Sequence, residues 1–180
     1  MKNICVFCGA RAGEDASLVD LTYNLGKEIV KNKQQVVCGG SNIGLMKAVT
    51  DGALSMGGNV IGVFPAILNG VEDPHPGIKE FIRTPCLPTR KQKMVDISDA
   101  FLILPGGYGT LDEIFEVVVL RRLNANKKQI LIMNYNNFYS PLLQQIEKMV
   151  VSGFISQDEA NLISIANNFT QLKLKLREIT

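Results

Sequence analysis

The stretch Pro105–Glu113 reads Pro-Gly-Gly-Tyr-Gly-Thr-Leu-Asp-Glu and combines three glycines with two adjacent carboxylates. An apolar run at 100–104 precedes it and an apolar-periodic segment at 111–124 follows it, which predicts a buried strand, a glycine-rich turn and a helix. The N–H groups at a helix start carry partial positive charge and bind phosphate, and glycine lets the backbone approach a ligand closely. We therefore expect this loop to hold a phosphorylated ligand beside Asp112 and Glu113.

Part of this stretch has a simpler interpretation. Thr110-Leu111-Asp112-Glu113 is also a T-x-x-E capping box, which only satisfies helix N–H groups, and similar patterns occur at 89–92 and 156–159. A capping box does not require three glycines within four positions, so we prefer a ligand-binding loop. If both interpretations hold, the cap is also what keeps Glu113 in place.

Length and composition indicate a single globular domain. The chain has 180 residues, which favours one domain spanning 1–180, and its 46% hydrophobic and 20% charged residues suffice for a sizeable core. The net charge of +2 is small and the basic residues are scattered, so no nucleic-acid or membrane partner is expected. No apolar stretch approaches the ~20 residues of a membrane-spanning helix. The first residues enter a strand pattern and not a signal peptide, which predicts a cytoplasmic protein.

The cysteines and the histidine limit the possible chemistry. Cys5 and Cys8 have C-x-x-C spacing, but residues three apart on a strand face opposite sides, so we expect buried free thiols, with Cys38 and Cys86, and no metal site. His75 is the single histidine, which excludes multi-histidine metal sites and disfavours a serine–histidine–acid triad. The chemistry is therefore left to carboxylates, Arg, Lys, Tyr or hydroxyl groups.

Strand and helix patterns alternate along the whole chain. This alternation predicts a single doubly wound, Rossmann-like α/β domain with a mainly parallel sheet. The expected strands lie at 4–7, 36–38, 60–64, 80–84 (an edge strand), 100–104, 129–133 and 162–165. The expected helices lie at 17–31, 45–56, 89–98, 111–124, 138–151 and 170–178.

The loops that leave the carboxyl ends of parallel strands share one sheet edge, where such folds bind ligands. That edge is expected to collect the loops at 8–11 and 39–44, the loop after Pro65, and the loop at 106–113. The first turn of the helix at 89–98 also lies there, with Arg90 and Lys91. An exposed, solvated Arg-Lys pair is the simple alternative, but the shared edge favours a ligand role for Arg90.

The combination of glycine turns, a cation and a carboxylate favours one kind of chemistry. The chain has no G-x-x-x-x-G-K-[ST] motif and no G-x-G-x-x-G after its first strand, which disfavours ATP hydrolysis and hydride transfer. A carboxylate beside a bound sugar phosphate suits cleavage of a glycosidic bond, because it stabilises an oxocarbenium-like transition state and orients a water molecule.

Several motifs together resemble those of the Lonely Guy family. Pro105–Glu113 is similar to that family's P-G-G-x-G-T-x-x-E motif, and Arg90-Lys91 to its R-K pair. The segment 37–46 resembles its G-G-G-x-x-G-L-M turn, and 6–9 resembles its opening strand. The resemblance covers roughly residues 4–165.

The resemblance implies an enzyme that hydrolyses the N-glycosidic bond of nucleoside 5′-monophosphates. The expected substrates are cytokinin riboside monophosphates or AMP, and the expected products are free base and ribose 5-phosphate. It also implies no cofactor, and a homodimer or larger assembly of this chain with sites near the dimer interface. The catalytic pair is expected to be Arg90 and Glu113. The other substrate-binding positions are expected at Gly39, Gly40, Glu72, Lys91, Gly106, Gly107, Tyr108, Gly109 and Thr110.

The chain departs from the family pattern at Ala10, Cys38, Leu87, Val119 and around His75. These departures affect the choice of substrate more than the type of reaction. Two other interpretations are a non-catalytic carrier of a nucleotide or phosphorylated cofactor, and an interaction module that uses the apolar helix at 114–120. For that helix, packing in the core or a homodimer contact is the simpler interpretation.

Overall fold

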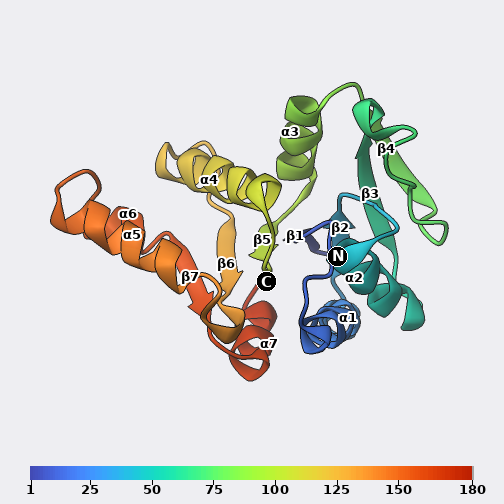
Figure 1. Ribbon diagram of the computed structural model, residues 1–180, viewed down its shortest axis with the longest axis horizontal. Helices are drawn as coiled ribbons and strands as arrows, with labels where there is room; N and C mark the ends of the chain where they lie inside the picture. The colour runs from blue at the N-terminus through green and yellow to red at the C-terminus, as the bar shows by residue number, and fades with distance from the viewer. Residues whose placement is uncertain (180) are drawn as a thin grey trace.

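Seven strands form one sheet in the order β4-β3-β2-β1-β5-β6-β7, and all six neighbouring pairs are parallel (Figure 1). The computed structural model describes residues 1–179. Helices return the chain between most successive strands, and the loop at 66–79 does so between β3 and β4, which keeps every pairing parallel. The strands are β1 (Asn3–Phe7), β2 (Gln35–Cys38), β3 (Val60–Pro65), β4 (Glu80–Thr84), β5 (Ala100–Ile103), β6 (Gln129–Met133) and β7 (Ile163–Ala166).

Helices cover both faces of the sheet, which confirms the doubly wound α/β prediction. One face packs against α1 (Ala16–Lys31), α2 (Gly44–Ser55) and α7 (Phe169–Arg177). The other face packs against α3 (Leu87–Ile97), α4 (Tyr108–Arg122) and α5 (Ser140–Val151), as the two helical layers of Figure 1 show. The chain also has a short α6 (Gln157–Ala160) and the 3-10 turns η1 (Ala66–Leu68) and η2 (Tyr135–Asn137), which the apolar pattern did not predict.

The strands divide the core into two layers by simple alternation. On β1, Ile4 and Val6 face the α1 layer, whereas Cys5 and Phe7 face the α4 layer. Cys8 packs in the α1 layer, so the two thiols of the C-x-x-C pair lie on opposite sides of the sheet, as predicted. Burial raises the pKa of both thiols, which keeps them neutral.

Cys86 differs from the expectation of buried thiols. It is only half-buried, and it is the N-cap of α3, where its Sγ lies 3.3 Å from the Thr89 hydroxyl. Hydrogen bonds from Thr89 lower the pKa of this thiol. Because Cys86 is the N-cap, the helix begins at Leu87, two residues before the predicted start. Thr89 is therefore not its N-cap.

The predicted capping box at Thr110 is also wrong. α4 begins at Tyr108 with Gly107 as N-cap, and no side chain caps it. Thr110 and Glu113 lie inside the helix, and Glu113 is held by another contact, described below. The T-x-x-E pattern is wrong here because Gly107 adopts the extended N-cap conformation (φ −93°, ψ −154°), so the helix begins without a polar capping side chain. The box predicted at Ser156–Glu159 is confirmed at the start of α6.

Two glycines bring α1 and α2 unusually close together. A Cβ atom on Gly26 would overlap the Val49 carbonyl oxygen, and one on Gly52 would overlap the Tyr23 carbonyl oxygen. Glycine is therefore required at both positions for the helix backbones to touch. This contact fixes α2, whose first turn follows the Gly39–Gly44 loop.

The sheet order places a topological switch point beside β1. The chain proceeds from β1 outward to β4 on one side, and from β5 outward to β7 on the other. The loops after β1 and β5 therefore diverge to opposite faces and open a crevice between them, where open α/β sheets bind ligands. No helix within residues 1–179 is long and apolar enough to cross a membrane.

Candidate active site

A cavity of 770 Å³ occupies this crevice at the carboxyl ends of β1 and β5. Its walls come from the loop after β1, the Gly39 turn, the start of α2, the loop after β3, α3, the glycine loop after β5 and the turn after β6. Of the predicted site residues, those that line it are Gly39, Glu72, Arg90, Gly106, Gly107, Gly109, Thr110 and Glu113. The remaining three, Gly40, Lys91 and Tyr108, do not line it.

The ion pair between Arg90 and Glu113 joins α3 to α4 at this cavity. Arg90 Nη1 donates to Glu113 Oε1 at 3.0 Å, and Arg90 Nε donates to the Val63 carbonyl oxygen at 3.1 Å. Both side chains are largely buried, with exposed fractions of 12% and 8%. The two expected catalytic residues are thus brought into direct contact.

Burial raises the pKa of Glu113 to about 7, and the positive charge of Arg90 limits that rise. The Glu113 carboxyl group is therefore close to half-ionised at neutral pH, a property typical of catalytic carboxylates. Arg90 is what holds Glu113 in place, and not a helix cap.

Gly39 makes room for this pair. A Cβ atom at Gly39 would overlap the Arg90 guanidinium and lie 2.7 Å from Met46 Sδ. The turn after β2 therefore contributes space for Arg90 at the cavity wall. Gly40 has φ +75°, a conformation that favours glycine. Its carbonyl oxygen accepts from the His75 N–H at 2.8 Å, so Gly40 supports the site without lining the cavity.

The start of α4, beside the cavity, has free backbone donors. Within residues 1–179, the N–H groups of Tyr108, Gly109 and Thr110 have no hydrogen-bond acceptor. A Cβ atom on Gly106 would overlap the Thr110 side chain, so Gly106 allows the buried Thr110 to fold against the loop. The Tyr108 side chain is 93% exposed and points away from the cavity. Free amides at a helix start form an anion site.

Glu72 reaches the cavity from the loop after β3. Its Oε2 is buried and has no hydrogen-bond partner within residues 1–179, so it is available to accept from a ligand. His75 anchors this loop, because its Nδ1 accepts from the Gly77 N–H at 3.1 Å and its Nε2 donates to Asp51 Oδ1 at 3.0 Å. No sequence pattern indicated this supporting position of His75.

Lys91 is turned away from the cavity. Its Nζ lies 2.8 Å from Asp112 Oδ2 and 2.6 Å from Glu116 Oε2, in ion pairs along the surface between α3 and α4. Asp112, which was expected beside the anion site, is engaged in this contact. The Lys91 ammonium group is thus neutralised by two carboxylates and strengthens the α3–α4 contact that also carries Arg90 and Glu113.

Sequence reasoning missed the rim of the cavity. Asp15 Oδ2 accepts from the Tyr135 hydroxyl at 2.7 Å and from Asn136 Nδ2 at 3.2 Å, which connects the loops after β1 and β6. Phe138 completes this side of the rim. No motif marks these residues, although their position after β6 places them at the same sheet edge.

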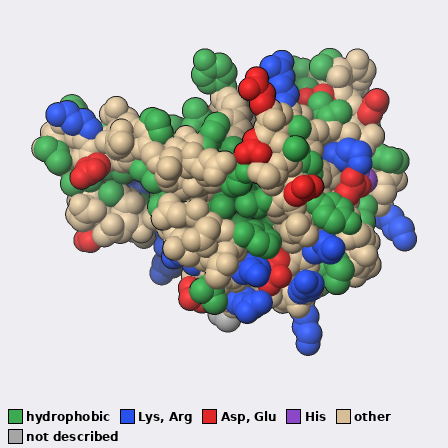
Figure 2. Space-filling model, turned by 60° about the horizontal axis from the view of Figure 1, so that its bottom comes forward, with side chains coloured by type: hydrophobic (Ala, Val, Ile, Leu, Met, Phe, Trp, Pro, Cys, Tyr) green, Lys and Arg blue, Asp and Glu red, His purple; other side chains and the backbone are tan. Residues whose placement is uncertain are grey.

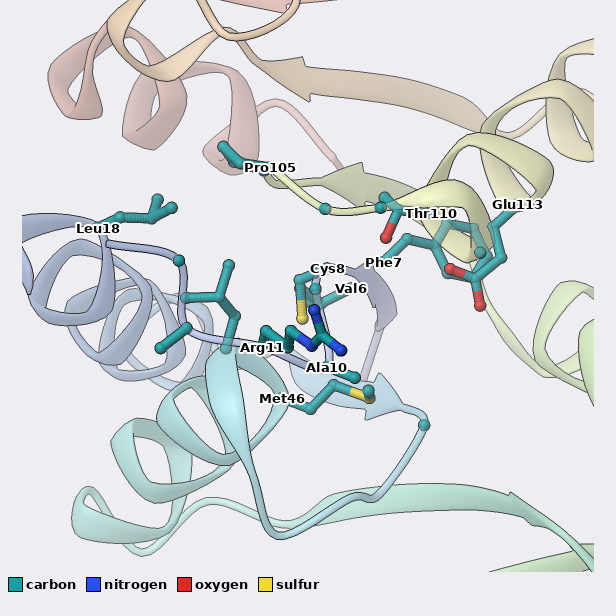
Figure 3. A pocket seen from close by; sticks show the side chains of 18 of the residues that line it. Val6, Phe7, Cys8, Ala10, Arg11, Leu18, Met46, Pro105, Thr110 and Glu113 are labelled. Atoms are coloured by element: carbon teal, nitrogen blue, oxygen red, sulfur yellow. The ribbon is translucent and has the colours of Figure 1, made fainter. Parts of the chain in front are cut away.

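Figure 3 shows Thr110 and Glu113 on one wall of the cavity, and Ala10, Arg11 and Met46 on the opposite wall. Of the departures from the family pattern, Ala10 lines the cavity, whereas Leu87 and Val119 are exposed on α3 and α4. No group of three or more His, Cys, Asp or Glu side chains within residues 1–179 is arranged to hold a metal ion. The site offers a buried carboxylate, a guanidinium group and an anion-binding helix start.

Solved structures with the same fold include the molybdenum cofactor carrier protein from Chlamydomonas reinhardtii. It has a TM-score of 0.74 and 20% sequence identity, and the match covers 99% of this chain and 97% of that one. The molybdenum cofactor binding protein from Rippkaea orientalis has a TM-score of 0.71 and 21% identity over 99% of this chain and 98% of that one. At these identities, the comparison shows the fold alone.

Two curated relatives are much more similar in sequence. Cytokinin riboside 5′-monophosphate phosphoribohydrolase LOG of Oryza sativa subsp. japonica is 39% identical, over 98% of this chain and 73% of the relative. The cytokinin riboside 5′-monophosphate phosphoribohydrolase of Rhodococcoides fascians is 38% identical, over 86% of this chain and 79% of the relative. A family model described as "Possible lysine decarboxylase" matches residues 46–176. These matches show that the chain belongs to the Lonely Guy family, the group that this model describes.

Proposed function

We propose that the protein hydrolyses the N-glycosidic bond of nucleoside 5′-monophosphates, with cytokinin riboside monophosphates or AMP as substrates. The observation that carries this proposal is the buried Arg90–Glu113 pair at a cavity whose wall includes the start of α4, where three helix amides are free. A carboxylate with a pKa of about 7 beside an anion site suits the cleavage of a phosphorylated glycoside. The relatives named as phosphoribohydrolases support the same reaction.

The substrate is positioned by contacts remote from the bond that breaks. The 5′-phosphate binds to the free N–H groups at the start of α4, where the helix dipole favours an anion. The free Oε2 of Glu72 accepts a hydrogen bond from a ribose hydroxyl group. These contacts hold the anomeric carbon near Glu113, so binding energy from the phosphate end serves the reaction.

The chemical step uses Glu113 in its ionised form. The C1′–N bond breaks, its electron pair goes to the leaving base, and the carboxylate stabilises the positive charge that develops on the ribose ring. Glu113 takes a proton from a water molecule whose oxygen adds to C1′, and that proton then neutralises the base. Arg90 keeps the carboxylate aimed at the reacting carbon, and the products are free base and ribose 5-phosphate.

The proposal includes a single domain over 1–180, a cytoplasmic location and a homodimer or larger assembly. The support for assembly is an apolar stripe on α4, formed by Phe115, Val119 and Leu123, with exposed fractions of 42%, 46% and 65%. Their four-residue spacing puts them on one helix face. Exposed apolar surface of this kind is typical of protein–protein contacts.

Incubation of the purified protein with AMP and with isopentenyladenosine monophosphate, followed by chromatography, tests the reaction. We expect free base from at least one of them, and a loss of about 100-fold or more in kcat for Glu113→Gln, because an amide cannot take a proton from water. Circular dichroism should show the fold retained, since glutamine is isosteric. Release of base by Glu113→Gln at the wild-type rate would contradict the proposal.

The free amides and the free Glu72 oxygen also suit a protein that only holds a phosphorylated ligand. A non-catalytic carrier of a nucleotide or phosphorylated cofactor is therefore the second candidate. The same incubation separates the two functions, because a carrier would bind the nucleotide tightly and release it intact. An interaction module without a ligand would bind neither compound.

A further inference from the structure

The cavity is short of available positive charge for a phosphorylated ligand. Within residues 1–179, the charged side chains that line it are two cations and four carboxylates: Arg11, Arg90, Glu14, Asp15, Glu72 and Glu113. Arg90 is bound to Glu113 and to the Val63 carbonyl oxygen, and Lys91 is bound to Asp112 and Glu116. Neither basic residue of the R-K pair is therefore free to neutralise a phosphate.

Arg11 is the exception. Its side chain is exposed at the cavity, and it has no ion-pair or hydrogen-bond partner within the described part of the chain. Figure 3 shows it extending from the wall with Ala10 and Met46 into the space opposite Thr110. A guanidinium group in this position is free to bind a ligand that reaches the glycine loop.

The backbone also places Arg11 beside that loop. The N–H of Gly9 donates to the Pro105 carbonyl oxygen at 3.1 Å. A Cβ atom at Gly9 would lie 2.9 Å from the Arg11 carbonyl oxygen and 3.5 Å from the Gly106 Cα atom. The loops after β1 and β5 are therefore in direct contact, and Arg11 begins next to the proposed phosphate site.

The balance of charge in the cavity indicates what Arg11 would contribute to ligand binding. A phosphate monoester carries roughly −1.5 to −2 charges at neutral pH, whereas a helix start supplies only about +0.5. The other lining charges sum to a negative value, because Arg90 is outnumbered by carboxylates. An Arg guanidinium group matches phosphate geometry with two parallel hydrogen bonds.

On the basis of the proposed function, we propose that Arg11 clamps the substrate's 5′-phosphate from the wall opposite the start of α4. Arg11 then makes the enzyme select nucleoside monophosphates over unphosphorylated nucleosides. It is a binding and specificity residue, and it takes no part in proton transfer. Ala10, its neighbour on that wall, has no polar side-chain atom that could share this role.

Arg11→Gln and Arg11→Lys test the proposal, with Lys31→Gln as the matched control. Lys31 is exposed at the last residue of α1, which runs antiparallel to the strands and so ends away from the cavity. The measurements are KM and kcat for AMP, and inhibition constants for ribose 5-phosphate, ribose and adenosine. These ligands separate binding of the phosphate from binding of the sugar and the base.

We expect Arg11→Gln to raise KM for AMP and the inhibition constant for ribose 5-phosphate by about 10- to 100-fold. The value of kcat and the inhibition constants for ribose and adenosine should stay close to those of the wild type, since only phosphate binding is removed. Arg11→Lys should recover part of the affinity, because it keeps the charge but loses the fork geometry.

Equal weakening of AMP and adenosine in Arg11→Gln would overturn the proposal, because Arg11 would then act on the nucleoside part. An unchanged KM for AMP would overturn it as well. If the wild type releases no base, the proposed reaction fails, but calorimetric titration with ribose 5-phosphate still tests the clamp. Wild-type affinity in Arg11→Gln would then contradict it, and a loss confined to the phosphorylated sugar would support it.

Discussion

Arg90 and Glu113 depend on each other in the folded chain. Each is a largely buried charge, and removing one would leave the other without compensation, at a cost of several kcal/mol. Gly39 and Val63 provide the space and the acceptor that fix the guanidinium group. At the residue scale, therefore, burial raises the pKa of the proposed catalytic carboxylate, and the contact that orients this group also limits the rise.

The acidity of Glu113 predicts the pH dependence of the reaction. With a pKa of about 7, its ionised fraction grows through neutrality, so kcat/KM for AMP should rise between pH 6 and 8. Arg90 lowers this pKa, so Arg90→Lys should weaken the contact and move the rise to higher pH. A pH profile of kcat/KM that rises at lower pH, or that Arg90→Lys leaves in place, would contradict this assignment.

The same shift affects stability with a definite sign. The pKa of Glu113 is raised from 4.5 in an exposed carboxyl group to about 7 in the fold. The folded state therefore binds the Glu113 proton more tightly than the unfolded state does. As a result, the contribution of Glu113 to the free energy of unfolding falls as pH rises between these two values. This loss of stability occurs at the position where the proposed reaction needs a carboxylate that is partly ionised at neutral pH.

At the element scale, close packing of α1 against α2 depends on Gly26 and Gly52. Alanine favours a helix interior by about 1 kcal/mol over glycine. A Cβ at Gly52, however, would overlap the Tyr23 carbonyl oxygen, which is backbone and cannot move independently. The two effects oppose each other, and overlap with backbone should dominate.

We therefore expect Gly52→Ala to lower the free energy of unfolding by about 2 kcal/mol or more, the cost of an overpacked contact. The measurement is the midpoint and slope of urea unfolding. Gly109→Ala is the matched control, because a Cβ atom there has nothing within 4 Å and the residue is also helical. Equal destabilisation by the two substitutions would contradict a role for the helix contact, because a Cβ atom at Gly109 meets no neighbour.

Sequence patterns predicted most elements well, for a physical reason. Strands such as β5 and β6 are continuous apolar runs because both of their faces are buried, and their bounds agree within one residue. The start of α4 was missed by three residues because Gly107 and Gly109 resemble a loop. Short turns such as η2 contain too few residues to show any period.

The candidate site was predictable only where residues form motifs. Arg90, Glu113 and the glycine loop have recognisable spacing, and the sheet edge brings them together. The turning away of Lys91 could not be predicted, because the carboxylates that attract it, Asp112 and Glu116, lie on another helix. Rim contacts such as Asp15 with Tyr135 join distant loops and leave no local pattern.

At the scale of the whole molecule, the α4 stripe and the charge distribution bear on assembly. The face drawn in Figure 2 has acidic and basic side chains interspersed, without a single continuous basic patch. The apolar helix at 114–120 was expected to pack in the core or in a homodimer contact, and its Val119 is half exposed in the single chain, next to Phe115 and Leu123. A second copy of the chain is the proposed cover for this surface.

Phe115→Lys should convert the proposed dimer into monomers, because each charge would be buried against an apolar surface. Sedimentation equilibrium measures the change. Leu174→Lys is the matched control, since Leu174 is 55% exposed on α7, on the other face of the sheet. A wild-type protein that is already monomeric, or dissociation by Leu174→Lys alone, would contradict a role for the α4 stripe.

The sheet order has a consequence for synthesis of the chain. The central strand β1 is made first, but its second neighbour β5 begins only at Ala100, so one edge of β1 must stay unpaired until then. Arg90 leaves the ribosome before β5, and Glu113 after it. The growing chain therefore carries half of the proposed catalytic pair, with an open edge in the middle of its future sheet, until β5 and α4 are added. The pairing of β1 with β5 and the contact of Arg90 with Glu113 thus both wait for the same segment of the chain.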